Sequence, residues 1–177
     1  VDSNIYVTGV SVSPSSLSLF TGETYSLSAS ITPSNATNKS VTWSSSNTNI
    51  ATVSSNGTVT AKASGSCTIY ATSAENSSFK CSCTVTVSDK QFTISPSSKS
   101  LYVGESFTIT YSATPDATPS FSSNNTSVAT IDANGKVTAK TQGSATISAT
   151  ANGITKTCAV TVSNNVLEFD GSSRTMY

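Results

Sequence analysis

The chain holds few of the side chains that catalysis requires. None of its 177 residues is a histidine, which removes the commonest general base, triad member and metal ligand. Serine is abundant, but no Gly-x-Ser-x-Gly motif occurs and no base is available to activate a hydroxyl. Gly65 and Gly143 precede alternating segments that predict strands, so neither begins a phosphate-binding loop that leads into a helix. The sequence therefore predicts a protein that is not an enzyme and binds no cofactor.

Acidic residues recur at one matching place in the two halves of the chain. Glu23 and Glu105 each follow a glycine, and we interpret them as solvated residues beside a turn. Other acidic residues are scattered, namely Asp89, Asp116, Asp132 and Asp170. A calcium site at the Asp89 junction is the alternative, but a hard cation needs several converging carboxylates and each half offers one. The sequence predicts no metal site.

The four cysteines leave two interpretations open. They are Cys67, Cys81, Cys83 and Cys158. If a turn falls near residues 75–78, two strands form a hairpin and Cys67 faces the region of Cys81 and Cys83. A Cys67–Cys83 disulfide would then require directly opposed positions. The second half has Ala145 in place of Cys67, so the fold does not depend on a bridge, and we favour buried reduced thiols. A zinc site lacks both the usual spacing and a fourth ligand.

Charge and hydropathy exclude two classes of partner. The chain has nine basic and nine acidic residues and a net charge of zero, so it lacks the basic surface of a nucleic-acid-binding protein. No segment approaches the roughly 18 to 20 continuous apolar residues of a membrane span, so we expect no membrane insertion. The first residue is Val1 rather than methionine. We therefore expect a processed product or an excised fragment.

One β-rich segment occurs twice. Residues 43–73 read WSSSNTNIATVSSNGTVTAKASGSCTIYATS and residues 121–151 read FSSNNTSVATIDANGKVTAKTQGSATISATA. Each copy contains two alternating apolar and polar runs with Asn-Gly between them, which predicts a hairpin with a type I′ turn. A repeat of this length predicts tandem domains rather than a solenoid.

The segments before each copy also alternate with a period of two. Tyr25, Leu27, Ala29 and Ile31 alternate with serine and threonine, as do Phe107, Ile109, Tyr111 and Ala113. This period predicts strands with one buried face. Four aromatic residues are therefore predicted to anchor the cores, namely Trp43, Tyr25, Phe107 and Phe121. The aromatic residues predicted to be exposed are Tyr6, Tyr70, Tyr102 and Tyr177.

These segments predict an all-β fold of two tandem immunoglobulin-like β-sandwiches. We expect a lead at residues 1–7, domain 1 at 8–88, a short linker at 89–91 and domain 2 at 92–163. Residues 164–177 are a tail or the start of a further module, in which Val166, Leu167 and Phe169 could form a strand. The linker of about three residues leaves little slack, so we expect a fairly stiff, elongated pair.

Two sets of residues carry a family resemblance. The first comprises Val10-Ser-Val12-Ser-Pro14, Leu19, Gly22, Glu23, Tyr25-Ser-Leu27, Pro33, Val41-Thr-Trp43-Ser-Ser and Ile50-Ala51-Thr-Val53. The second comprises Asn56-Gly57-Thr-Val59-Thr-Ala61-Lys62-Ala63, Gly65, Thr68-Ile69 and Cys83-Thr-Val85-Thr-Val87. In these residues the chain resembles the bacterial immunoglobulin-like domain, group 2, and the second copy keeps most of the pattern, with Phe121 in place of Trp43.

The resemblance implies a role without chemistry. It implies a structural or adhesion module of a bacterial cell-surface or secreted protein, acting as a rigid spacer or as a weak face for a surface protein or glycan, with further domains of a larger polypeptide as neighbours. One alternative is a phage virion protein that decorates a capsid or tail and contacts the host surface. Another is an accessory carbohydrate-binding module of a secreted enzyme. Fold-level resemblance does not name a ligand.

Overall fold

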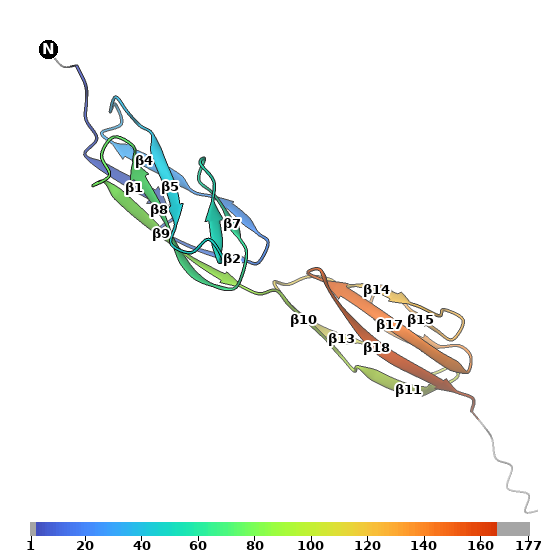
Figure 1. Cartoon of the computed structure of the whole chain (residues 1–177). Helices are drawn as coiled ribbons and strands as arrows, with labels where there is room; N and C mark the ends of the chain where they lie inside the picture. Colours follow the sequence, from blue (N-terminus) through green and yellow to red (C-terminus); the bar gives the residue numbers. More distant parts are fainter. Residues whose placement is uncertain (1–2, 166–177) are drawn as a thin grey trace, which may run out of the picture. The chain divides into compact units, whose positions relative to one another are not determined.

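The structure, a computed structural model, describes residues 3–165. Within this range every regular element is a β-strand, as the sequence predicts (Figure 1). The same range contains no helix that is long and apolar enough to cross a membrane. The chain divides into two compact units, Val1–Lys90 and Gln91–Tyr177, called unit 1 and unit 2 below. The strand predicted in the tail from Val166, Leu167 and Phe169 lies outside the described residues.

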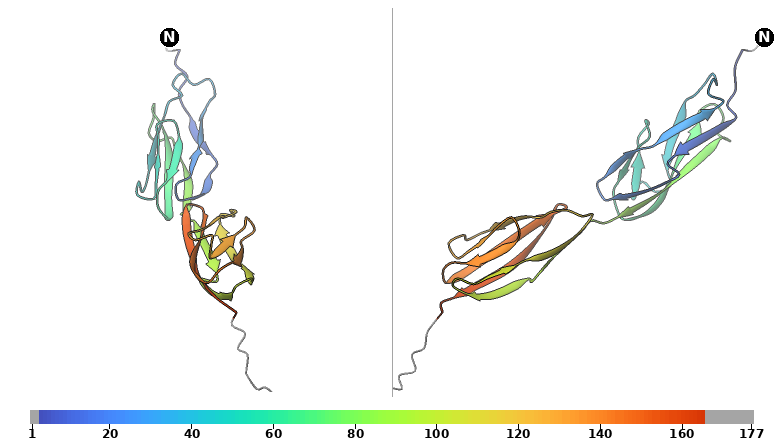
Figure 2. Two further views of the ribbon diagram at one scale, coloured as in Figure 1. Left: turned by 90° about the vertical axis from the view of Figure 1, so that its right-hand side faces the viewer. Right: turned by 180° about the vertical axis from the view of Figure 1, so that it is seen from behind.

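Unit 1 contains nine strands. They are β1 (Gly9–Ser13), β2 (Ser16–Phe20), β3 (Thr24–Ser26), β4 (Ser28–Thr32), β5 (Val41–Ser45), β6 (Ala51–Val53), β7 (Thr58–Ala61), β8 (Gly65–Ser73) and β9 (Lys80–Ser88). One layer is the four-stranded sheet β2-β9-β8-β5. The other layer consists of the pair β1-β4 and the three-stranded sheet β3-β7-β6 (Figure 2). Two sheet layers that enclose one core make the predicted sandwich.

The core of unit 1 follows from the two-residue period of its strands. Ala51 and Val59 come from one layer, and they pack in one cluster with Ile69, Cys83 and Val85 from the other layer. Along β9 the residues between the buried ones are Ser82, Thr84, Thr86 and Ser88, and all of these are exposed. Beyond Lys80 at its start, the outward face of this strand is therefore covered with hydroxyl groups.

The chain changes sheets at two places in unit 1. Pro14 lies between β1 and β2, which belong to different layers, so the change of sheet falls at a residue that cannot donate a ladder hydrogen bond. Leu27 separates β3 from β4, so one extended segment pairs first with β7 and then with β1. The buried Leu27 donates its backbone N–H to the carbonyl of Gly57 at 3.0 Å, which fixes the point of change.

Unit 2 repeats this arrangement with nine strands. They are β10 (Gln91–Ser95), β11 (Ser98–Tyr102), β12 (Ser106–Thr108), β13 (Thr110–Thr114), β14 (Ser120–Ser123), β15 (Ala129–Ile131), β16 (Lys136–Ala139), β17 (Gly143–Ala151) and β18 (Ile154–Ser163). The sheet β11-β18-β17-β14 faces the pair β10-β13 and the sheet β12-β16-β15. Strand order and strand directions match those of unit 1 element by element.

The predicted Asn-Gly hairpins are present, but their predicted turn type is wrong. β6 pairs with β7 and β15 pairs with β16, both antiparallel. Only the glycine of each Asn-Gly has positive φ, at 84° for Gly57 and 80° for Gly135, whereas a type I′ turn needs positive φ at both central residues. The N–H of Gly57 bonds the carbonyl of Ser54, so the loop holds four residues and the glycine ends it.

Candidate functional site

The aromatic residues that were predicted as core anchors fall into two groups. Trp43 packs against the core of unit 1, and Phe107 and Phe121 pack against the core of unit 2. Tyr25 does not anchor a core, because it is 42% exposed whereas its register partner Val59 is fully buried. Phe107 takes the same register position on the equivalent edge strand β12, and Tyr25 differs from it by a hydroxyl group, which favours contact with water.

A glycine holds each central aromatic ring in place. A Cβ on Gly57 would lie 2.8 Å from the Trp43 ring and 2.8 Å from the carbonyl oxygen of Leu27. A Cβ on Gly135 would lie 3.2 Å from the Phe121 ring and 3.1 Å from the carbonyl oxygen of Ile109. Glycine is therefore needed at both positions, for its positive φ and for the close approach of the turn to a ring.

The four cysteines are free thiols in the structure. The predicted β8–β9 hairpin places Cys67 opposite Val85 and Cys83 opposite Ile69. The Cys67–Cys83 disulfide that the sequence left open is therefore not formed, because the two residues are not directly opposed. Burial raises the pKa of Cys83 above its ordinary value of 9.0, and the nearby Cys67 raises it further. Burial likewise raises the pKa of Cys158 and of Cys81.

The repeated glutamates lie beside turns, as predicted, and Glu105 is exposed, but each carboxylate also bonds the backbone of its turn. The Oε2 atom of Glu23 accepts a 2.8 Å hydrogen bond from the backbone N–H of Phe20. Glu105 repeats this contact with the backbone N–H of Tyr102, also at 2.8 Å. The signal in the sequence was the fixed spacing of Gly-Glu after a short apolar strand in both copies. No group of three or more potential metal-ligating side chains occurs within residues 3–165.

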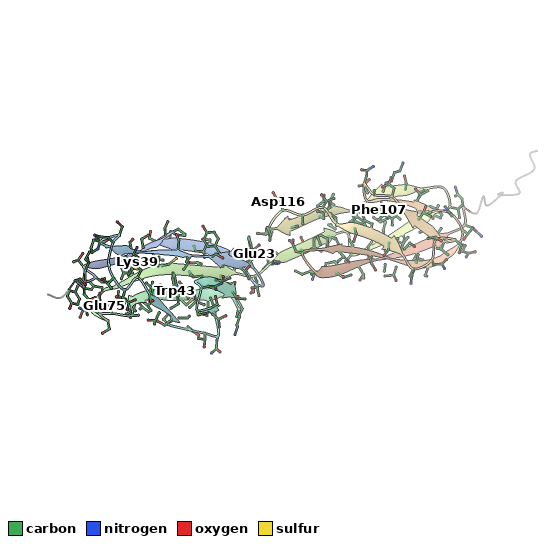
Figure 3. The ribbon with its side chains drawn as sticks, turned by 90° about the horizontal axis from the view of Figure 1, so that it is seen from above. Glu23, Lys39, Trp43, Glu75, Phe107 and Asp116 are labelled. Carbon is green, nitrogen blue, oxygen red and sulfur yellow. The ribbon has the colours of Figure 1, made fainter. Side chains whose placement is uncertain are left out.

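A hollow of about 460 Å³ lies on the surface of unit 2. It is lined by the β13 residues Tyr111, Ser112 and Ala113 and by the following loop residues Asp116, Ala117 and Thr118. Figure 3 shows Asp116 on this loop, at one end of the unit. The sequence period predicted Tyr111 on a buried face, but its side chain is 46% exposed.

Two buried or half-buried rings support Tyr111 from below. Its ring centroid lies 6.4 Å from that of Phe92 and 6.4 Å from that of Phe121, both in tilted or edge-on geometry. The Nδ2 group of Asn152 donates a 2.8 Å hydrogen bond to the carbonyl of Pro115 and so fastens the loop at the rim. The hollow therefore combines a supported aromatic ring with a carboxylate and hydroxyls.

Unit 1 has a hollow between β4 and β5 that overlaps this place in part. It is also about 460 Å³, and its lining includes Ala29, Ser40, Asn56 and the half-buried ring of Trp43. Ala29 occupies the register position of Tyr111, since Ala29 pairs with Val12 as Tyr111 pairs with Ile94. The other predicted exposed aromatics are Tyr6 and Tyr102, which are exposed, and Tyr70, which is half-buried under Lys80. Tyr177 lies outside the described residues.

Two sandwiches with this strand order define the immunoglobulin-like class of β domains. The sequence profile of the bacterial Ig-like domain (group 2) matches residues 6–85 and again residues 89–162. The chain belongs to this family, as the sequence resemblance predicted. No curated protein sequence matches the chain at a significant level.

Solved structures that are similar to the chain include three of different origin. The surface layer protein SbsC, domains 1–6, is 17% identical with a TM-score of 0.42, covering 92% of this chain and 29% of that one. An intimin mutant from EHEC O157:H7 is 22% identical with a TM-score of 0.38, covering 51% and 52% of the two chains. Human protocadherin-24 EC1-2 is 14% identical with a TM-score of 0.40, covering 92% and 100%. The chain thus spans under a third of the SbsC structure.

Proposed function

We propose that the chain is a non-catalytic structural module of a bacterial cell-surface or secreted protein and acts there as a spacer. Family membership supports this proposal, because the resemblance on which it rests implies such proteins. The proposal includes the domain boundaries expected from the sequence, 8–88 and 92–163 with a linker at 89–91. It also includes further domains of a larger polypeptide as the chain's neighbours.

One observation carries the proposal, namely the path of the polypeptide through unit 1. At the beginning of the unit, the N–H of Val7 donates a 2.7 Å hydrogen bond to Glu75. At its end, the carbonyl of Ser88 accepts a 3.0 Å hydrogen bond from the N–H of Thr21, two residues before Glu23. Figure 3 shows Glu75 and Glu23 at opposite ends of unit 1. A domain that the chain crosses from end to end adds its own length to the polypeptide.

Epitope accessibility on a cell surface tests the spacer role. A short epitope is displayed on a bacterial anchor directly, through unit 1 alone, or through the whole chain, and antibody access is measured beneath a layer of surface polysaccharide. A spacer raises access with each unit added. A flexible linker of the same number of serine and glycine residues is the control, because a random coil gains reach only with the square root of its length. Equal access through the chain and through the coil would contradict the proposal.

The hollow beside Tyr111 favours a second candidate function, a weak saccharide-binding face on unit 2. Sugars present apolar C–H faces that stack on exposed aromatic rings, and hydroxyl groups that bond carboxylates and hydroxyls. Tyr111 offers such a ring, while Asp116 and Thr118 offer the polar groups. Unit 1 has Ala29 at the register position of Tyr111, and the ring that lines its hollow is that of Trp43.

A glycan array separates the two candidates. A pure spacer binds nothing above background, whereas a saccharide face retains a set of glycans and loses them in Tyr111→Ala. The matched control is Tyr102→Ala, which removes another exposed tyrosine of unit 2 that does not line the hollow. Equal losses in both variants would count against the hollow as the site. The virion protein and the accessory module of a secreted enzyme stay predictions, which the neighbouring genes and domains would decide.

A further inference from the structure

Each unit contains one pair of parallel strands, formed by a strand near the beginning of the unit and the last strand of the unit. In unit 1, β2 runs parallel to β9, with Ser16 opposite Thr84 and Phe20 opposite Ser88. In unit 2, β11 runs parallel to β18, with Ser98 opposite Ala159 and Tyr102 opposite Ser163. Every other strand pair within the described residues is antiparallel. The two parallel pairs join an early strand of a unit to its last strand.

Parallel direction decides how these strands respond to tension along the polypeptide. Tension pulls the beginning of β2 toward one end of unit 1 and the end of β9 toward the other end. The strands are therefore drawn in opposite directions along their own axes. The ladder hydrogen bonds run across the strands, so such a pull shears all of them together instead of opening them one at a time. We propose that the β2–β9 and β11–β18 pairs are mechanical clamps that let each unit carry load without unfolding.

The ladder continues beyond the strands at both ends. In unit 1 the N–H of Thr84 bonds the carbonyl of Ser15 at 3.0 Å, and the N–H of Thr21 bonds the carbonyl of Ser88 at 3.0 Å. In unit 2 the corresponding bonds are Ala159 N–H to Ser97 at 2.9 Å and Val103 N–H to Ser163 at 3.0 Å. β1 precedes the clamp and pairs with β4, so it is loaded first, but its release leaves the clamp closed.

The clamp of unit 1 is attached more firmly than that of unit 2. Leu17 and Leu19 of β2 both pack against the core, whereas at the position of Leu17 β11 has the exposed Lys99. Directly after β9, the carboxylate of Asp89 accepts two hydrogen bonds, from the hydroxyls of Thr21 at 3.0 Å and Ser64 at 2.8 Å, whereas Asn164 after β18 donates one, to Gln142 at 3.0 Å. We therefore expect unit 2 to yield at a lower force than unit 1.

Single-molecule force spectroscopy of the whole chain tests the clamps. With handles at the chain ends, each unit unfolds in its own event, and a glycine-serine insertion in loop 34–40 lengthens the event of unit 1 and so identifies it.

The force in this geometry is compared with that for handles at residues 16 and 84. These are exposed register partners at one end of the β2–β9 ladder, so pulling there breaks its bonds in sequence. The clamp predicts an end-to-end force at least about twofold higher, because several hydrogen bonds share that load. Equal forces in the two geometries would overturn the proposal, and this comparison leaves the ladder residues unaltered.

Three variants of β2 assign the effect to the ladder. Ser15 and Thr21, which flank β2, both form backbone hydrogen bonds to β9. Backbone groups alternate in direction along a strand, so the other odd-numbered residues of β2 also direct their N–H and C=O groups toward β9. The N–H of Leu17 therefore belongs to the ladder, whereas the N–H of Ser18 points away from it. Leu17→Pro removes a ladder donor and should lower the unfolding force of unit 1 below that of Leu17→Ala, which removes only packing. Ser18→Pro introduces the same ring without that loss and should keep the wild-type force. Circular dichroism shows beforehand that each variant is folded. The proposal fails if Leu17→Pro and Leu17→Ala unfold at the same force, or if Ser18→Pro weakens unit 1 as much as Leu17→Pro does.

Discussion

The two units share one backbone frame but fill it with different side chains. Unit 1 places a large ring, Trp43, on β5, and small or medium residues, Val10 and Ala29, on the facing pair β1–β4. Unit 2 has the smaller Phe121 on β14, and its β10–β13 pair carries Phe92 and Tyr111 at those positions.

Aromatic volume has therefore moved from one layer of the sandwich to the other while strand order and register stayed the same. Phe92, only 2% exposed, is the centre of a second core cluster with Ala149 and Ala151. The comparison teaches that the backbone ladder and the turn glycines define this fold, whereas the core needs a certain total volume that either layer can supply.

Removal of the central ring should give the largest difference between the units. Trp43→Ala leaves a cavity that no other large ring of unit 1 fills, so we expect a loss of about 3 to 5 kcal/mol from unit 1 alone. Phe121→Ala should cost unit 2 less, about 2 to 3 kcal/mol, because Phe92 and Tyr111 remain beside the gap. Differential scanning calorimetry of the whole chain measures both losses as shifts of separate transitions. A greater loss for Phe121→Ala would contradict the idea that volume is shared between layers.

The turn glycines should give the next largest difference. Gly57→Ala forces a positive φ on alanine and brings its methyl within 2.8 Å of the Trp43 ring. Gly135→Ala imposes the same φ with looser contacts of 3.1 to 3.2 Å. We expect losses of about 2 to 4 kcal/mol and about 1 to 2 kcal/mol respectively, measured by urea unfolding. If the double variant Gly57→Ala with Trp43→Phe does not recover part of the loss, the ring contact is not its source.

Asn152 should contribute a smaller effect that is confined to unit 2. It is the one non-glycine residue among positions 3–165 with positive φ, at 55°, and its side chain bonds the carbonyl of Pro115. Alanine tolerates positive φ less well than asparagine and cannot form the hydrogen bond to Pro115. Asn152→Ala should therefore lower the free energy of unfolding of unit 2 by about 1 to 2 kcal/mol. Asn152→Gly keeps the φ and loses only the bond, so its cost in the same urea titration should be about half. Identical costs would show that the hydrogen bond carries the whole effect.

The buried thiols should give the smallest effect, visible only in alkali. Burial raises the pKa of Cys83 and Cys158 above the ordinary value of 9.0, so the unfolded chain releases these protons at lower pH than the folded chain. Stability from this source is complete below about pH 8 and falls as the pH rises through the unfolded pKa. The variants Cys83→Ala and Cys158→Ala should show a shallower loss of stability between pH 8 and pH 10 in thermal melts. If the variants lose stability with rising pH as steeply as the wild type does, the thiols are not the cause of that loss.

Much of the fold was predictable because alternating apolar residues and repeated Asn-Gly and Gly-Glu pairs are local signals. The Trp43 anchor and the β8–β9 hairpin both follow from such signals. Tyr25 and Tyr111 were misplaced, because a period of two identifies a face but not how far each side chain on that face is covered. The turn type at Gly57 was wrong because the loop length depends on where β6 ends.

The candidate site was harder to predict than the fold. The hollow at Tyr111 forms from β13 and the loop after Pro115, and only tertiary packing decides how deep it is. The turn between β17 and β18 was also missed, although Asn152-Gly153 is the two-residue turn with positive φ at both positions that a type I′ hairpin requires. The Asn-Gly pair that predicts this turn is present in the sequence, but it was overlooked beside the Asn-Gly pairs of the two repeated segments.

The hydroxyl-covered outer face of β9 has a consequence for the medium in which the protein works. Mobile ions screen charges and leave hydroxyl groups almost unaffected. With 10% charged residues in the chain, the free energy of unfolding should change little between dilute fresh water and brine. A surface of serine and threonine thus makes the stability of the fold nearly independent of the salt concentration.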